Sequence, residues 1–147
     1  MTREYSAGGI VFRQPPTNNI QQTMWLVCQH SQHKGWVFPK GLIGDKLENE
    51  SKEETALREV KEETGVEGKI VQQIPNEVKY WYQFKGEKIF KTVYFYLMEF
   101  VGGDIRKHDH EMMDVKWVTT DEVKNVLSYA NDKKAFDEAL KIFNKLT

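Results

Sequence analysis

The segment 51–65 constrains the fold most, because it carries helix signals at both of its ends. Ser51 and Glu54 have the spacing of a capping box, and Gly65 stands where a helix commonly ends. At 100° per residue, one stripe of this helix is formed by Ala56, Leu57, Val60 and Thr64. We therefore expect an amphipathic helix that packs this stripe against a sheet.

Segments typical of strands surround this helix in the sequence, since they mix β-branched and aromatic residues between turn formers. The expected strands are 5–13, 24–28, 36–38, 69–74, 77–84, 88–100 and 113–118. Residues 85–87 are expected to form a hairpin turn, and Gly102 with Gly103 to break the sheet. Further helices are expected at 120–127 and 132–146. This order predicts an α/β (α+β) fold in which one mixed β-sheet is sandwiched between α-helices.

The composition is that of one folded domain covering residues 1–147. Of these residues, 39% are hydrophobic and 12% aromatic, and the formal net charge of -1 excludes a disordered chain. Cys28 is the single cysteine, so no internal disulfide forms, which is typical of a reducing compartment. Arg3 and Glu4 stand where a signal peptide is apolar, and no apolar run has the roughly 18 residues of a membrane span. We expect a cytoplasmic protein that does not enter a membrane, and the sequence predicts no particular oligomeric state.

The near-neutral net charge hides an acidic block between Gly44 and Glu67. That block holds nine acidic and four basic residues, a balance of -5, which leaves +4 on the rest of the chain. A solvated helix face is the ordinary explanation. Glu59, Glu62 and Glu63, however, share an arc beside the apolar stripe, at spacings where like charges destabilise a helix by roughly 0.2–0.5 kcal/mol per pair. Because Mg²⁺ prefers oxygen ligands, the block predicts either a solvated face or a divalent-cation site.

The same segment resembles the Nudix box, the signature of the Nudix hydrolase family. The pattern of the box is G-x5-E-x7-R-E-U-x-E-E-x-G-U, where U is an aliphatic residue, and the chain matches it over residues 44–66. The match covers nine specified positions across 23 residues, so it is far more specific than a lone glycine pattern. The resemblance implies a Nudix-like sheet between helices.

Gly41 is a second candidate for the glycine of the box. In relatives this glycine often follows Pro-Lys, as Gly41 does here, three residues before Gly44. The resemblance implies that the backbone carbonyl of this glycine binds metal. Asn49 stands where relatives usually have a glycine, so the loop departs from the family pattern while the helical half of the box is intact.

The resemblance also implies roles for the charged residues of the box. The implied ligands of Mg²⁺ or Mn²⁺ are Glu59, Glu62, Glu63 and Gly41. The residues that would shape the box are Gly44, Glu50 and Gly65. Arg58 would pair with Glu50 and thereby hold the loop against the helix.

The chemistry that such a site implies is attack of a metal-activated water on a phosphate of a nucleoside diphosphate linked to another group. The general base is a carboxylate, which is Glu59 in some members and a later loop residue in others. The segment 108–111, His-Asp-His-Glu, has three interpretations: a zinc site, a surface loop, or a source of Glu111 as a further carboxylate for Mg²⁺. Zinc normally needs three or four ligands, and no cysteine pair supports it here. The implied catalytic residues are Glu59, Arg58 and Glu111.

Aromatic residues and lysines follow one another on two expected strands. Tyr80 and Tyr82 share one strand face, and Trp81 takes the other, because side chains alternate along a strand. These rings indicate either an aromatic sheet core or a platform on which adenine stacks. In the second case Lys88 and Lys91 would neutralise phosphates.

Several features together resemble the diadenosine tetraphosphate hydrolase branch of the family. They are the run Trp-x-Phe-Pro-Lys-Gly at 36–41, the Tyr-Trp-Tyr strand, and Glu111 before Trp117. The resemblance implies asymmetric cleavage of diadenosine tetraphosphate to ATP and AMP. The implied substrate contacts are Lys40, Tyr80, Tyr82, Lys88 and Lys91.

Two other interpretations stay open. The same scaffold suits nucleoside triphosphates, ADP-ribose or a 5'-triphosphate RNA end, although the +4 outside the acidic block is spread out and nucleic acid is not otherwise expected as a partner. A nucleotide-sensing module without turnover is the alternative of another class. Degenerate members of that kind usually lose glutamates from the box, whereas Glu59, Glu62 and Glu63 are all present.

Overall fold

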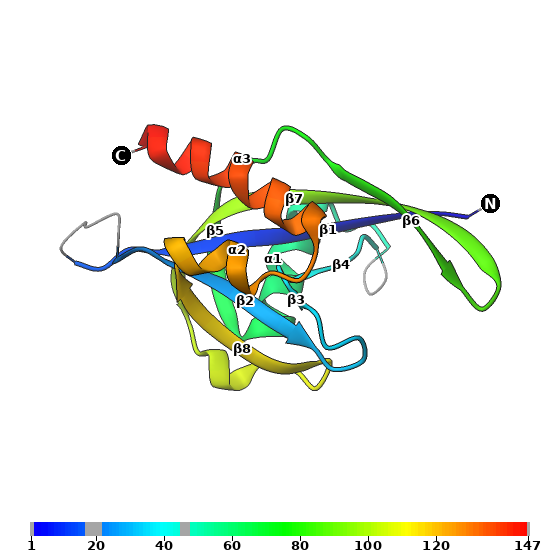
Figure 1. Ribbon diagram of the computed structural model, residues 1–147, viewed down its shortest axis with the longest axis horizontal. Helices are drawn as coiled ribbons and strands as arrows, with labels where there is room; N and C mark the ends of the chain where they lie inside the picture. The colour runs from blue at the N-terminus through cyan, green and yellow to red at the C-terminus, as the bar shows by residue number, and fades with distance from the viewer. Residues whose placement is uncertain (1, 17–21, 45–47, 147) are drawn as a thin grey trace.

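Two long strands, β1 (Thr2–Arg13) and β7 (Glu87–Gly103), form the centre of the sheet (Figure 1). They run parallel, with Glu4 opposite Lys91 near the beginning of the ladder. The computed structural model describes residues 2–16, 22–44 and 48–146. Because β1 and β7 are long, each has different neighbours along its two halves, and the sheet fans out at both ends.

The shorter strands attach to these two. β4 pairs with the middle of β1 and β6 with the first half of β7, whereas β2 pairs with the end of β1 and β5 with the second half of β7. β3 and β8 both pair with β2. The bounds are β2 (Met24–His30), β3 (Trp36–Val37), β4 (Lys40–Leu42), β5 (Val66–Gln73), β6 (Val78–Phe84) and β8 (Met112–Thr119).

Helix α1 (Lys52–Thr64) begins and ends as the sequence predicts. The Ser51 hydroxyl accepts a hydrogen bond from the Glu54 backbone N–H, and the Glu54 carboxylate accepts one from the Ser51 backbone N–H, which completes the capping box. Gly65 adopts the left-handed conformation with φ 80° and ends the helix. The apolar stripe of α1 packs on one face of the sheet, in a cluster with buried side chains that include Ala7, Val11, Tyr96 and Met98.

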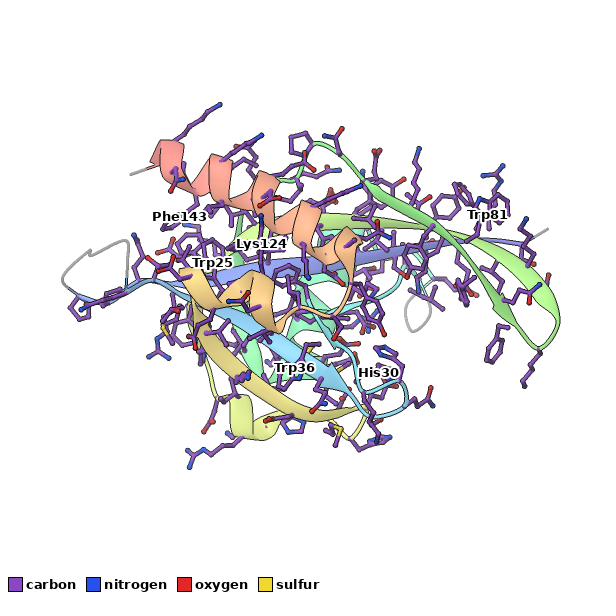
Figure 2. All side chains as sticks on the ribbon, viewed as in Figure 1. Trp25, His30, Trp36, Trp81, Lys124 and Phe143 are labelled. Atoms are coloured by element: carbon purple, nitrogen blue, oxygen red, sulfur yellow. The ribbon has the colours of Figure 1, made fainter. Side chains whose placement is uncertain are left out.

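Helix α3 (Ala130–Leu146) covers the opposite face of the sheet (Figure 1). Its Phe136 and Phe143 contact the buried Trp25 edge to face, with ring centroids 5.0 and 5.4 Å apart. Figure 2 shows Trp25 and Phe143 close together beneath α3. Helices therefore cover both faces of a mixed sheet, and the predicted sandwich is confirmed.

Several predicted boundaries were wrong. Gly102 and Gly103 do not break the sheet, because they pair with Glu67 and Val66 of β5, and β7 ends only at Gly103 with φ 95°. The helix expected at 120–127 is divided into a 3-10 turn (Thr120–Glu122) and the short α2 (Val123–Val126). We also expect a loop at 41–49 from its two glycines, but residues 41 and 42 belong to β4, and residues 45–47 lie outside the described part of the chain.

The β6–β7 hairpin projects beyond the body of the molecule together with the beginning of β1 (Figure 1). Lys85 and Gly86 at its turn have φ values of 51° and 78°, and Gly86 has open space around it. We call the part of β1, β6 and β7 that projects in this way the ribbon. None of the helices in the described ranges combines the length and apolar character needed to span a bilayer.

Candidate active site

A cavity of about 770 Å³ lies between the helical half of the acidic block and the ribbon. Its lining comes from β3, β4, α1, β6, β7, the segment before β8 and the beginning of α3. The volume is within the range of small-molecule sites. The predicted site residues that line the cavity are Lys40, Gly41, Glu59, Glu62, Glu63, Tyr80, Tyr82, Lys91 and Glu111.

The carboxylates of α1 form one wall. Glu59 and Glu63 lie one turn apart and are each only 6% exposed, whereas Glu62 is half-buried. Burial, and next the charge of Glu59, raise the pKa of Glu63 to about 8, although Lys40 opposes the shift through its charge and its backbone N–H, 3.1 Å from Glu63 Oε1. The solvated-face interpretation of the acidic block therefore does not describe Glu59 and Glu63.

Arg58 connects these carboxylates to the preceding loop. Its Nε and Nη2 donate to the two oxygens of Glu50 at 2.8 Å, as the motif predicts. Its Nη1 donates to Glu59 Oε1 and Glu62 Oε2, also at 2.8 Å. The hydrogen bonds from Arg58 lower the pKa of Glu50, which is buried and also accepts from Thr55. One guanidinium thus fixes the loop, the helix and two carboxylates of the cavity wall.

The two candidate glycines have different structural roles. A Cβ built on Gly41 would lie 2.1 Å from Cδ of Glu59, so a larger residue there would force that carboxylate to move. Gly44 has φ 77° and does not line the cavity. Gly41 is therefore the glycine at the site, and Gly44 serves the turn that follows β4.

The chemistry of the donor set fits Mg²⁺ or Mn²⁺. Glu59, Glu62 and Glu63 provide hard oxygen donors, and burial followed by the charge of Glu59 raises the pKa of Glu63, an effect that a cation beside it would oppose. In the described ranges no three His, Cys, Asp or Glu side chains are grouped as a metal site, and Arg58 holds oxygens of both Glu59 and Glu62. A cation at this wall would take over part of the neutralisation of Glu59 and Glu62 that Arg58 provides here.

The segment 108–111 is divided by the structure. Asp109 and Glu111 line the cavity, whereas His108 and His110 do not. The backbone N–H of Asp109 donates to the Glu62 carbonyl at 3.0 Å, which ties this segment to α1. Glu111 is thereby on the same cavity as the carboxylates of the box.

The structure brings two of the three predicted lysines to the cavity. Lys40 and Lys91 line it, whereas Lys88 lies over the Trp81 ring, 4.5 Å from its centroid, on the other face of the ribbon. The structure therefore does not bring Lys88 to this cavity with the other two lysines. Lys88 and Lys91 are three residues apart on β7, an odd spacing. Because side chains alternate along a strand, this spacing already predicts that the two lysines lie on opposite faces.

Neighbouring charges influence both cavity lysines. Burial alone would lower the pKa of Lys40, but negative groups, Asp132 first among them, outweigh it and raise that pKa. Burial, and then the charge of Lys40, lower the pKa of Lys91, while Glu4 and Glu63 oppose the change. The cavity thus holds two ammonium groups near the carboxylate wall.

Tyrosines form the wall on the ribbon. Tyr80 and Tyr82 face the cavity with ring centroids 6.2 Å apart. Trp81 points to the opposite face, where it is 48% exposed and packs on Phe90. Figure 2 shows Trp81 on the projecting ribbon, far from the core around Trp25. The predicted alternation of the three rings is confirmed.

Sequence reasoning missed a second aromatic group at the cavity. The rings of His30 and His33 stack with centroids 4.4 Å apart, and the Tyr129 hydroxyl lies 3.1 Å from His33 Nδ1. The buried Asp132 of α3 also lines the cavity. These residues come from the end of β2, the turn that follows it, the residue before α3 and the first turn of α3, and no local pattern marks any of these positions.

Comparisons with known proteins agree with this geometry. The family model for the NUDIX domain matches residues 4–140. The chain is similar to "Putative mutator protein MutT4" of Mycobacterium tuberculosis (strain CDC 1551 / Oshkosh), with 37% identity over 145 residues, which are 97% of this chain. The chain spans only 57% of the length of that relative.

Solved structures share the fold. An Ap4A hydrolase of C. elegans in a binary complex matches with a TM-score of 0.75 and 21% identity, over 97% of this chain and 98% of that one. The NUDIX domain of Shewanella oneidensis NrtR complexed with ADP ribose matches with a TM-score of 0.73 and 23% identity, over 100% of this chain and 90% of that one. Fold, box residues and family model agree, and the chain belongs to the NUDIX domain family.

Proposed function

We propose that this protein hydrolyses a phosphoanhydride bond of nucleoside polyphosphates with the help of Mg²⁺. The observation that supports the proposal is the division of charge within one cavity. Glu59 and Glu63 form a buried carboxylate wall, and Lys40 and Lys91 lie near it. A site of this kind suits a substrate that is polyanionic and binds divalent cations.

The residues of the chain have distinct roles in this proposal. Glu59, Glu62, Glu63 and the Gly41 carbonyl would hold the cation. When bound, a divalent cation lowers the pKa of water and offsets charge on the reacting phosphate. Lys40 and Lys91 bind the phosphate chain through charge-assisted hydrogen bonds.

A carboxylate accepts the proton of the attacking water. Glu59 and Glu111 are the two candidates, since both line the cavity. Glu59 already accepts a hydrogen bond from Arg58, whereas Glu111 comes from a separate segment beside α1. Replacing Glu111 by Gln tests the choice: loss of the acidic limb of the kcat profile, with metal binding retained, assigns the base to Glu111.

Diadenosine tetraphosphate is the first substrate to test, with ATP and AMP as products. Aromatic groups at two parts of the cavity support it: Tyr80 and Tyr82 on the ribbon, and His33 after β2 with Tyr129 just before α3. Each offers a face for one adenine. The fold likeness to an Ap4A hydrolase agrees with this choice.

A nucleoside triphosphate is the second candidate. The relative at 37% identity carries the name of a mutator protein. In the cavity, the buried Asp132 offers oxygens that would accept from the amino group of a base. This interpretation needs one base site, whereas a dinucleotide needs two.

Identification of products decides between these substrates. The protein is incubated with Mg²⁺ and, separately, with diadenosine tetraphosphate, nucleoside triphosphates, ADP-ribose and a 5'-triphosphate RNA. Formation of ATP plus AMP at the highest kcat/KM supports the first candidate. Release of pyrophosphate from a triphosphate at a higher kcat/KM favours the second. Binding of nucleotide with no product from any of them would instead indicate a sensing module.

A further inference from the structure

Glu4 is an acid beside the cavity that belongs to no motif and does not itself line the cavity. It lies near the beginning of β1, directly opposite Lys91 of β7, which in turn is opposite Tyr80 of β6. Residues that face each other across paired strands share one face of a sheet, so Glu4 is on the face of the ribbon that carries the tyrosines. Its side chain is 24% exposed and that of Lys91 is 16% exposed.

Two groups of the cavity wall meet at the Glu4 carboxylate. The Tyr82 hydroxyl donates a hydrogen bond to Glu4 Oε1, and the Lys91 ammonium lies 3.9 Å from the same oxygen. Both contacts influence pKa values. Burial, and next the hydrogen bond to Glu4, raises the pKa of Tyr82. The charge of Glu4 also opposes the lowering of the pKa of Lys91.

A carboxylate beside Lys91 is expected to weaken the binding of a polyphosphate, so its presence there calls for a separate structural role. Lys91 already has the charge needed for a phosphate, and a carboxylate beside it offsets that charge. The geometry provides that role, because a hydrogen bond to the Tyr82 hydroxyl limits the rotamers of that side chain and so lowers the entropy cost of ordering it against a substrate. Glu4 is the acceptor that holds it.

We propose that Glu4 is a positioning residue for the nucleoside end of the substrate, because its carboxylate fixes the Tyr82 ring against the cavity and directs the Lys91 ammonium. The inference rests on the proposed function and adds to it a residue outside the box. The base of a nucleoside polyphosphate stacks on the ring that Glu4 holds. Glu4 itself does not touch the reacting atoms.

The test compares Glu4→Ala, Glu4→Gln, Tyr82→Phe and the double variant E4A/Y82F. Binding of a non-hydrolysable ATP analogue with Mg²⁺ is measured by calorimetry, and kcat and KM are measured on the best substrate. Glu4→Ala is expected to weaken binding about tenfold, within the range for losing a base–aromatic stack. We expect kcat to stay within about twofold, because the lost interaction is equal in the ground state and the transition state.

The double variant separates positioning from a general effect on folding. Glu4 acts on the ring through the Tyr82 hydroxyl, so E4A/Y82F should bind no more weakly than Glu4→Ala alone. Glu4→Gln retains an acceptor oxygen and should recover most of the affinity. Additive losses in E4A/Y82F, or wild-type affinity in both Glu4→Ala and Tyr82→Phe, would overturn the inference.

Two controls lie on the same ribbon. Glu87 is an exposed acid that accepts a hydrogen bond from the Thr2 hydroxyl but does not line the cavity, and Trp81 is the ring on the opposite face. Glu87→Gln and Trp81→Phe should bind the analogue like the wild type. If Glu4→Ala does not fold, Tyr82→Phe alone decides, because wild-type affinity in it overturns the inference. Absence of nucleotide binding by the unaltered protein would overturn the proposed function as well, which distinguishes the two failures.

Discussion

Gly41 and Glu59 lie in such close contact that a methyl group on Gly41 would occupy the place of the carboxyl carbon, 2.1 Å away. The strand β4 and the helix α1 meet at this point, and the direction of the Glu59 carboxylate depends on the missing side chain. The contact means that a side chain at position 41 would displace the Glu59 carboxylate, whereas Gly44, three residues later, satisfies the spacing of the box without lining the cavity.

Gly41→Ala is therefore expected to lower kcat about 100-fold, because a displacement of about 1 Å at a reacting group has an effect of that size. Gly44→Ala is the contrast, since its φ of 77° strains an alanine but its turn is outside the cavity lining. That variant should lose about 1 kcal/mol of stability and keep its kcat within about twofold. Steady-state kinetics and denaturant unfolding measure the two effects, and equal kcat values in both variants would contradict the assignment of Gly41.

The Glu63 carboxyl makes stability in the absence of metal depend on pH. Its pKa is raised from 4.5 to about 8, so the folded state binds a proton more tightly than the unfolded state. The associated stability is complete below about pH 4.5 and is lost as the pH rises toward 8. Relative to Glu63→Gln, the wild type should lose on the order of 2–4 kcal/mol over this interval, measured by urea unfolding in a chelator. Parallel curves for the two proteins would exclude this origin of the effect.

Mg²⁺ should reverse that loss in the wild type. A cation that binds the folded state alone stabilises it in proportion to the logarithm of its concentration above Kd. The melting temperature at pH 8 should therefore rise with Mg²⁺ in the wild type and stay nearly constant in Glu63→Gln. Chelation should abolish hydrolysis, and Mg²⁺ or Mn²⁺ should restore it. A similar rise in melting temperature in both proteins would place the cation elsewhere.

Arg58 should matter for stability as well as for activity. Its fork holds the buried Glu50, so Arg58→Met leaves that carboxylate without its strongest partner and should lower the free energy of unfolding by about 3 kcal/mol. Lys61, on the same helix, pairs with Glu67 at the surface, where the two side chains are 64% and 50% exposed. Lys61→Met is the matched control and should change stability by less than about 1 kcal/mol.

The two faces of the ribbon give a test of the phosphate contacts. Lys40→Met and Lys91→Met should each raise KM roughly tenfold or more, since each removes a charge-assisted hydrogen bond of about 1.5–3 kcal/mol. Lys88→Met removes the same charge from the other face and should leave KM within about twofold. Equal effects of Lys88→Met and Lys91→Met would show that the substrate does not enter the cavity.

Much of the site could be predicted because its signals are local. The capping box, the end of α1 at Gly65, and the arc of Glu59, Glu62 and Glu63 all follow from the 3.6-residue period of one helix. The pairing of Arg58 with Glu50 could be predicted from the motif alone. The faces of Tyr80, Tyr82 and Lys91 follow from alternation, and the same rule excludes Lys88 once it is applied along the whole strand.

The sequence by itself therefore determined the helix, the acidic wall and the family, because those features depend on spacings within a few turns of chain. Only the tertiary structure decided that Glu4 meets Tyr82, that Tyr129 reaches His33, and that Asp132 enters the same cavity. These contacts join residues 78 and 96 positions apart in the first two cases. They depend on how β1 pairs with β7 and on where α3 packs. The periodicity of residues within one helix or strand predicts neither of these.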